Sequence, residues 1–139
     1  MRKFLIATHG TMAAGIQNAL QIITGDTQRL AVINAFVGVE NPSDLIQAYF
    51  QNQDEQDEII ILTDLPGGSV NQLLIHYLKR PHTHLVSGIN LSLVLALVLD
   101  PQQTDTAAMI REAIDASREQ ILYINEKVKQ INADLSTIF

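Results

Sequence analysis

Two side chains that could act together in catalysis stand directly after predicted strands of this sequence. His9 follows the apolar run of residues 3–8, and Asp64 follows the apolar run of residues 58–63. Each precedes the expected start of a helix, where unpaired N–H groups and the positive end of the helix dipole attract anions. The segment Pro66-Gly67-Gly68-Ser69 adds an unobstructed loop and a hydroxyl group. The pattern predicts a crevice with an imidazole, a carboxylate that could orient it, and donors for an anion.

These residues also have structural interpretations. A single histidine after a strand is often structural, Asp64 could cap the loop or the helix that follows, and Gly67-Gly68 could form only a tight turn. The chain has three further histidines, His76, His82 and His84. The first lies opposite the apolar stripe of its predicted helix, and the other two have no third metal ligand nearby. We therefore take His9 and Asp64 as the candidate pair and expect no metal site.

Several well-known chemistries are excluded by missing motifs. The chain has no Gly-x-x-x-x-Gly-Lys-Ser/Thr loop, no Gly-x-Gly-x-x-Gly after a strand and no Gly-x-Ser-x-Gly elbow. A phospho-accepting aspartate of the receiver type would need paired acids after the first strand to hold Mg²⁺. The chain has Ala7-Thr8-His9 at that place.

Composition narrows the class of protein further. Among 139 residues, 9 Lys or Arg and 15 Asp or Glu give a net charge of −6, which argues against nucleic-acid binding. Cysteine is absent, so disulfides, thiolate metal sites and cysteine nucleophiles are excluded. Residues 91–99 are about half the ~20 residues of a membrane span, and residues 1–8 are too short for a signal peptide. We expect one soluble domain in the cytoplasm.

The order of elements predicts an α/β fold. Four apolar runs are typical of buried strands, at residues 3–8, 30–36, 58–63 and 84–87. Helical periodicity and capping residues predict helices between them and after them, at residues 12–24, 42–53, 69–78 and 91–99. Alternating strands and helices favour an open, mainly parallel, doubly wound sheet with helices on both faces.

The last third of the chain allows two interpretations. Apolar residues spaced three and four apart from Ala107 to Ile138 predict one continuous amphipathic helix with a coiled-coil seam. Against this, Ile121-Leu122-Tyr123-Ile124 is a compact run of residues that favour strands. Periodicity does not decide between them.

The motifs taken together resemble one family. The resemblance rests on four blocks in order: Phe4-Leu5-Ile6-Ala7-Thr8-His9-Gly10 with Ala13-Ala14-Gly15; Val39-Glu40-Asn41 with Leu45-Ile46; Leu62-Thr63-Asp64 with Gly67-Gly68-Ser69; and Val86-Ser87-Gly88-Ile89-Asn90. They are similar to the IIA component of mannose-family sugar phosphotransferase systems (PTS), over about residues 1–125. The histidine and Asp–Gly-Gly-Ser blocks are the more specific pair.

The resemblance implies a phosphoryl carrier without a cofactor or metal. His9 would take phosphate through Nε2 from the phosphocarrier protein HPr and pass it to a separate IIB component that serves sugar uptake. Asp64 would hold the other ring nitrogen and fix the tautomer. The candidate phosphoryl-binding residues are Gly10, Thr11, Gly67, Gly68 and Ser69.

The resemblance also implies a homodimer. In the family a late edge strand is exchanged between subunits, and this favours a strand over residues 121–125 rather than the continuous helix. Residues 1–125 would then form the carrier domain, and residues 126–139 a helical extension.

Departures from the family pattern lie in the loop that would face a partner. The family often has an aromatic residue where Leu65 or Pro66 stands, and Pro-Phe where this chain has Val70-Asn71.

Three alternative functions stay open: a carrier subunit serving dihydroxyacetone kinase, a non-enzymatic module regulated by phosphorylation of His9, and a flavodoxin-like domain that binds a small anion.

Overall fold

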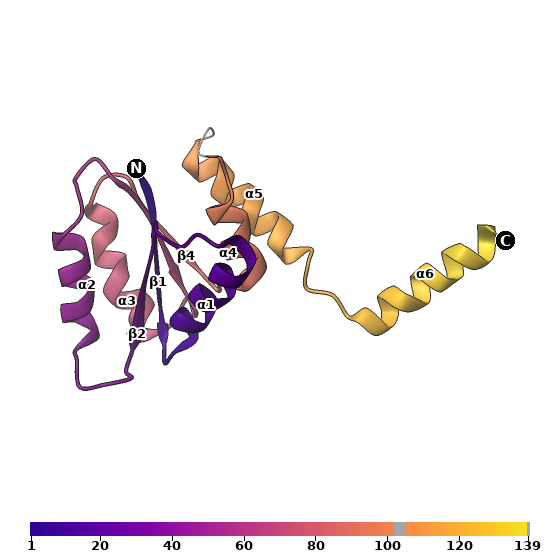
Figure 1. Ribbon diagram of the computed structural model, residues 1–139, viewed down its shortest axis with the longest axis horizontal. Coiled ribbons are helices and arrows are strands. Elements are labelled where there is room, and N and C mark those ends of the chain that lie inside the picture. The colour runs from indigo at the N-terminus through magenta and orange to yellow at the C-terminus, as the bar shows by residue number, and fades with distance from the viewer. Residues whose placement is uncertain (102–104, 139) are drawn as a thin grey trace.

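The protein contains a four-stranded, wholly parallel sheet. The computed structural model describes residues 1–101 and 105–138. The strands are β1 (Arg2–His9), β2 (Leu30–Ala35), β3 (Glu58–Thr63) and β4 (Thr83–Ser87), in the order β2-β1-β3-β4 (Figure 1). The chain runs from β1 outward to β2, and then returns to β3 on the other side of β1. The strand order therefore reverses between β1 and β3, where ligands and reactive groups gather in open α/β sheets.

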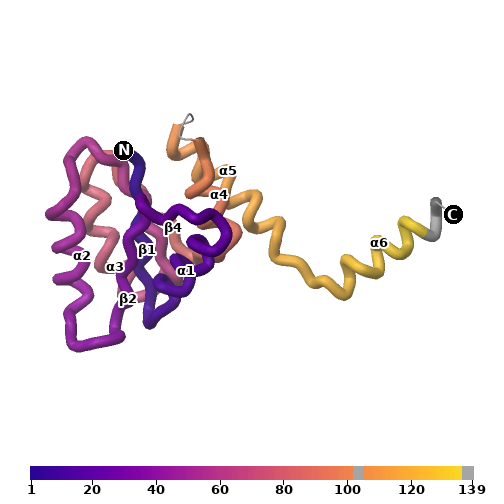
Figure 2. The backbone as a smooth tube through the Cα atoms, in the orientation of Figure 1, coloured from indigo at the N-terminus to yellow at the C-terminus, as the bar shows by residue number. Residues whose placement is uncertain are grey.

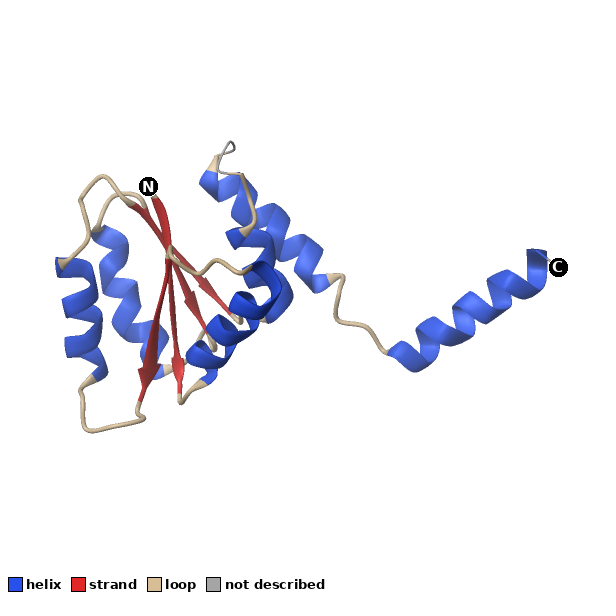
Figure 3. Ribbon diagram, viewed as in Figure 1, coloured by secondary structure: helices blue, strands red, loops and turns tan. Residues whose placement is uncertain are grey.

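Helices cover both faces of this sheet, as the sequence predicts (Figure 3). One face packs against α1 (Met12–Thr24), α4 (Leu91–Val98) and α5 (Thr106–Arg118). The other packs against α2 (Pro42–Gln51) and α3 (Ser69–Ile75), which continues into a short 3₁₀ helix, η1 (His76–Lys79). The α/β doubly wound prediction is confirmed.

The central strand explains why the sheet is covered twice. Phe4 and Ile6 of β1 lie in the core beneath α1, α4 and α5, whereas Leu5 and Ala7 lie in the core beneath α2 and α3. All four are fully buried, so β1 is apolar throughout rather than alternating. This buried strand is a rigid base for the residue at its end, His9.

Strand register determines which residues share the carboxyl edge of the sheet. His9 pairs with Ala35 of β2, and Ala7 pairs with Thr63 of β3. The residues that directly follow these strands, Phe36 and Asp64, therefore emerge at the same edge as His9.

The end of the chain differs from both predictions. Helix α5 ends at Arg118, residues 121–123 have no regular secondary structure, and α6 (Ile124–Ile138) extends away from the sheet (Figures 1 and 2). The continuous helix is wrong because the backbone turns after α5, where Gln120 N donates to Ser117 O at 3.1 Å. The strand over residues 121–125 is not formed in the single chain, where residues 121–123 are irregular and residues 124–125 begin α6. This segment pairs with none of the four strands, and a strand exists only through pairing.

Among the described residues, no helix is both long and apolar enough to cross a bilayer.

Candidate functional site

His9 is the last residue of β1 and is displayed at the carboxyl edge of the sheet. Gly10 follows it with φ 60°, a left-handed conformation that favours glycine, and turns the chain toward α1. The Gly10 amide donates to the Ala35 carbonyl at 2.9 Å, which ties this turn to the end of β2. The His9 side chain is 39% exposed, so the ring is held by its neighbours but remains accessible.

The Asp64 carboxylate contacts both the backbone amide and the ring of His9. Asp64 Oδ2 accepts from the His9 amide at 2.8 Å and lies 2.9 Å from His9 Nδ1. The second oxygen, Oδ1, accepts from the Leu65 amide at 2.9 Å. The carboxylate is only 12% exposed, and its bonds set the position of the imidazole relative to the sheet.

The electrostatics of Asp64 define the state of the imidazole. Burial raises the pKa of the Asp64 carboxyl, but hydrogen bonds from the amide and ring of His9 and from the Leu65 amide lower it by more, so the pKa lies below its usual value. An ionised carboxylate only accepts hydrogen bonds, and we therefore assign the ring proton to Nδ1. In the neutral imidazole, Nε2 then carries the ring lone pair that Asp64 leaves free.

The Gly68-Ser69 turn lies beside the His9 ring, next to Cε1 and Nε2. Ser69 Oγ lies 3.4 Å from His9 Nε2, a long contact at the ring nitrogen that Asp64 does not bind. A Cβ atom on Gly68 would lie 3.1 Å from His9 Cε1, so the ring occupies space that only glycine leaves open. Gly67 lies in the same loop, and a Cβ on it would meet no atom within 4 Å.

Thr11 completes the set of predicted residues. It stands before α1, and its side chain makes no capping bond to that helix. The structure thus brings His9, Asp64, Gly68 and Ser69 into contact, whereas Gly10, Thr11 and Gly67 form the flanking turns.

Two further residues shape the site without having been singled out from the sequence. Asn71 is 7% exposed; its Oδ1 accepts from Thr63 Oγ1 at 2.9 Å and its Nδ2 donates to the Pro66 carbonyl at 2.8 Å. Asn71 therefore ties the end of β3 to Pro66 and holds the loop that carries Asp64 in place. The other is Phe36, whose ring stacks on the His9 ring with centroids 5.6 Å apart. The available signals were a polar residue on the buried face of a predicted helix and an aromatic residue at the end of a predicted strand.

The other histidines lie away from this edge. His76 and His82 are exposed, and His84 Nε2 lies 3.7 Å from Glu58 Oε2. In the part of the chain that the structure describes, no group of three or more His, Asp or Glu side chains could hold a metal ion.

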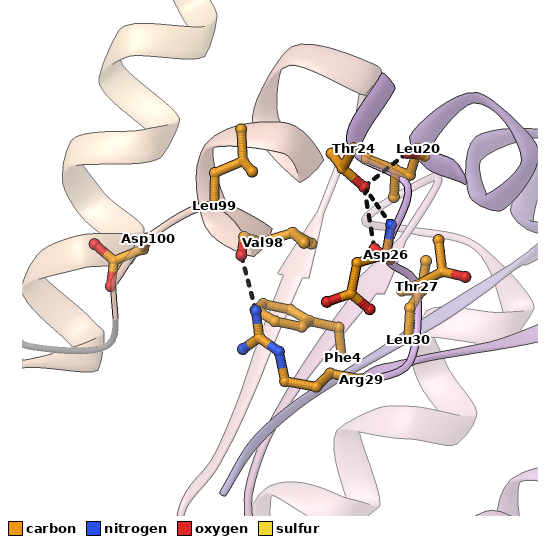
Figure 4. Close-up of a pocket in the computed structure, with 10 residues that line it drawn as sticks. All are labelled: Phe4, Leu20, Thr24, Asp26, Thr27, Arg29, Leu30, Val98, Leu99 and Asp100. Carbon is orange, nitrogen blue, oxygen red and sulfur yellow. Dashed lines mark hydrogen bonds between the residues drawn. The ribbon is translucent and has the colours of Figure 1, made fainter. Parts of the chain in front are cut away.

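A cavity of about 310 Å³ lies at the opposite end of the sheet (Figure 4). It is bordered by Phe4 and Leu30, near the starts of β1 and β2, and by Arg29, whose Nη2 donates to the Val98 carbonyl at 3.0 Å. Because His9 ends β1 and Phe4 lies near its start, this cavity is separate from the histidine site and shares no residue with it.

Solved structures show the same architecture with related sequences. A protein from Klebsiella pneumoniae, assigned as a phosphoenolpyruvate-dependent sugar PTS permease, has 33% identity and a TM-score of 0.87, covering 91% of this chain and 93% of that chain. The PTS component EIIA from Streptococcus agalactiae has 26% identity and a TM-score of 0.78, with coverage of 91% and 99%. A PTS IIA protein associated with the fucose utilization operon of Streptococcus pneumoniae has 25% identity and a TM-score of 0.75, with coverage of 91% and 96%.

The sequence itself matches the EIIA-man family, described as the PTS system fructose IIA component, over residues 3–114. This match covers most of the chain and includes both His9 and Asp64. The chain belongs to the mannose-type EIIA family and is a component of a phosphotransferase system.

Proposed function

We propose that this protein carries a phosphoryl group on His9, accepting it from phospho-HPr and passing it to a separate IIB component of a sugar PTS. The observation that supports this most strongly is the 2.9 Å contact between His9 Nδ1 and Asp64 Oδ2. It leaves Nε2 as an accessible nucleophile at the point where the strand order reverses. Family membership supports the class of reaction, and this geometry supports Nε2 of His9 as the acceptor atom.

The proposed step moves one phosphoryl group between two imidazoles. The Nε2 lone pair of His9 attacks phosphorus, the bond from phosphorus to the donor imidazole breaks, and the donor nitrogen keeps that electron pair. The Nδ1 proton stays on His9, and Asp64 compensates the positive charge that the ring gains. Because one phosphohistidine replaces another, the transfer is nearly isoenergetic and runs in both directions.

The turns around His9 would bind the phosphoryl oxygens. The amides of Gly10 and Gly68 already donate to the Ala35 and Leu65 carbonyls, at 2.9 Å and 3.2 Å. Because these two amides are already engaged, Gly10 and Gly68 would not donate to the phosphate; they would leave room for it and allow the chain to turn. The proposed donors are the amide of Gly67 and the hydroxyls of Thr11 and Ser69, since positioned donors are the main means of catalysis in phosphoryl transfer.

An exposed apolar surface supports a protein, rather than a small molecule, as the phosphoryl donor. Met12, Val37 and Leu65 are each exposed by more than two-fifths of their surface, at 42%, 56% and 57%. They follow β1, β2 and β3, so they belong to the same edge as His9. We propose this docking patch as the contact surface for HPr and IIB, because apolar side chains at an interface core are shielded from water on binding.

The proposed assembly is a homodimer formed through the end of the chain. Four consecutive apolar residues, Ile121 to Ile124, are exposed by half of their surface or more. Exchange of residues 121–125 onto the sheet of a second copy would cover them, and it would supply the pairing that the single chain lacks.

Phosphorylation in a reconstituted system tests the function directly. The protein is mixed with phosphoenolpyruvate, enzyme I and HPr, and its intact mass is measured before and after mild acid. We expect one acid-labile phosphate, located at His9 and absent from His9→Ala. The exposed His76 provides the matched control, because His76→Ala should be labelled like the wild type. Labelling of His9→Ala, or no labelling of the wild type, would refute the assignment.

A further inference from the structure

Phe36 has a backbone conformation that aromatic residues rarely adopt. It directly follows β2 with φ 65°, in the left-handed region. Among the described residues only Phe36 and His82 combine a side chain with positive φ. Such a conformation is costly for a residue with a Cβ, and it persists where the surrounding structure enforces it. Asparagine or glycine would be the ordinary choice at this turn, so the identity of Phe36 requires another explanation.

Burial in the core does not provide that explanation. Phe36 is 57% exposed, whereas Ala35 immediately before it is fully buried. The left-handed turn instead places the Phe36 ring over the imidazole of His9, with centroids 5.6 Å apart and an interplanar angle of 25°. This separation is typical of offset-stacked aromatic rings. The hydrogen bond from the Gly10 amide to the Ala35 carbonyl fixes the turn after β1 relative to the turn after β2.

The stack restrains a motion that Asp64 leaves free. The contact between Nδ1 and Asp64 Oδ2 fixes one atom of the imidazole, but the ring can still tilt about that contact. On the other side of the ring, Ser69 Oγ lies 3.4 Å from Nε2 and limits this tilt. Phe36 covers a face of the ring, so the three neighbours together determine the direction of Nε2.

We propose that Phe36 is a positioning residue for phosphoryl transfer, an inference that rests on the proposed function of His9. Its ring keeps the imidazole plane in the orientation that aims the Nε2 lone pair at the incoming phosphorus. When the bond from Nε2 to phosphorus forms and Nδ1 keeps its proton, the imidazole becomes cationic. The π face of Phe36 then stabilises that cation next to the Asp64 carboxylate.

Transfer kinetics with phospho-HPr separate positioning from docking. Phe36→Leu keeps an apolar side chain without a π face, and Phe36→Tyr keeps the stack. We expect Phe36→Leu to lower the rate constant at saturating phospho-HPr by about 3- to 10-fold with little change in KM, from the usual strength of an aromatic pair. Phe36→Tyr should keep the wild-type rate constant. A raised KM with an unchanged rate constant would overturn the proposal and make Phe36 part of the docking surface.

The matched control is another stacked phenylalanine. Phe50 stacks on Tyr77 with centroids 4.3 Å apart, in the core beneath α2 and α3. Phe50→Leu should leave the transfer rate constant unchanged. Phe36→Gly is a second test variant, because glycine adopts the left-handed turn without strain, and it should slow transfer as Phe36→Leu does.

Proton NMR of unphosphorylated protein tests the stack independently of any transfer. The ring current of Phe36 should shift the His9 ring protons upfield in the wild type and in Phe36→Tyr. The shift should be lost in Phe36→Leu and kept in Phe50→Leu. Identical His9 resonances in the wild type and Phe36→Leu would overturn the inference. Failure of the wild type to accept phosphate would instead overturn the proposed function, and the two outcomes are therefore distinguishable.

Discussion

At the scale of single residues, the site depends on one carboxylate that holds both the backbone and the ring of the same histidine. Asp64 Oδ2 accepts from the His9 amide at 2.8 Å and contacts His9 Nδ1 at 2.9 Å. The first bond positions the end of β1, and the second selects the tautomer. Because one oxygen makes both contacts, a substitution that keeps the shape of Asp64 but removes its charge tests the carboxylate as a unit.

Asp64→Asn should slow transfer by up to ~10⁴-fold while preserving the fold. Because Oδ2 makes both contacts to His9, an amide nitrogen in its place would face the His9 amide donor, donate to Nδ1 and move the ring proton to Nε2. An amide oxygen in its place would keep both contacts but would carry no charge to compensate the imidazolium. Single-turnover transfer from phospho-HPr measures the loss, and Asp115→Asn, an exposed carboxylate on α5, serves as the control. A rate equal to that of the wild type would reduce Asp64 to a loop cap.

Two adjacent glycines provide a second test at this scale. A Cβ on Gly68 would lie 3.1 Å from His9 Cε1, whereas a Cβ on Gly67 would meet nothing within 4 Å. Gly68 has φ −76°, which alanine adopts without strain. Gly68→Ala should therefore displace the imidazole and slow phosphorylation, with a thermal midpoint close to that of the wild type. Gly67→Ala keeps the backbone amide proposed as a donor and places its Cβ in open space, so it should match the wild type in both measurements. Equal rates for the two variants would contradict this account.

At the scale of elements, strands and helices were predictable because their patterns are local. The continuous apolar runs identify β1 and β3, and the rule that reactive groups follow parallel strands selects His9 and Asp64. The contribution of Phe36 was not predictable, because it depends on the register of β2 against β1. Asn71 was missed for a similar reason, since its two partners are recognised only once α3 packs onto β3.

The elements at the opposite end of the sheet are joined by a buried ion-pair network. Arg2, 6% exposed, donates from Nε to Glu58 Oε1 at 2.8 Å and from Nη2 to Thr106 Oγ1 at 2.9 Å. Its Nη1 also donates to Asp100 at 2.9 Å. The network thereby connects β1 and β3 with the start of α5 and the end of α4.

Acid should weaken this network through Glu58. Burial raises the pKa of Glu58, but hydrogen bonds from Thr106 and Arg2 and the Arg2 charge lower it by more, so the folded pKa lies below the usual 4.5. A depressed carboxyl pKa stabilises the fold above the unfolded value, and this contribution is lost as the pH falls through the folded value. The thermal midpoint should therefore fall as the pH is lowered below 4.5.

Glu58→Gln tests this assignment. It should lower the thermal midpoint near neutral pH, because buried Arg2 loses an ionic partner. Its midpoint should approach that of the wild type as the pH falls through the folded pKa of Glu58. Exposed Glu55 provides the control, since Glu55→Gln should follow the wild-type profile. A constant difference between Glu58→Gln and the wild type at every pH would show that Glu58 contributes nothing through its ionisation.

At the scale of the whole molecule, the C-terminal segment exposes apolar residues, and the β4 edge of the sheet has backbone groups that pair with no other described strand and could bind such a segment. Helix α6 extends from the domain and has an apolar stripe that is about half exposed, formed by Val128, Ile131 and Leu135. A helix of 15 residues is only marginally stable alone in water, so it needs a surface to pack on. Within the described residues β4 pairs with β3 alone, which leaves its other edge open.

A groove of about 400 Å³ lies along that open edge, between β4, α4 and α5. Ser87 borders it, and the Ser87 hydroxyl is buried without a hydrogen-bond partner in the described part of the chain. Residues 121–125 of a second copy would supply backbone groups for the edge and apolar side chains for the groove. The same contact would give α6 a partner surface.

Sedimentation should therefore show a dimer at micromolar concentration. Combining Leu122→Glu with Tyr123→Glu should produce a monomer, because two charges cannot be buried against β4 without a large desolvation cost. Ile22→Glu changes an apolar residue on α1 that is 76% exposed, and it should leave the dimer intact. A monomeric wild type, or dissociation caused by Ile22→Glu as well, would contradict exchange at this edge. Because His9 and Asp64 come from one chain, we expect the monomeric variant to accept phosphate, which separates assembly from catalysis.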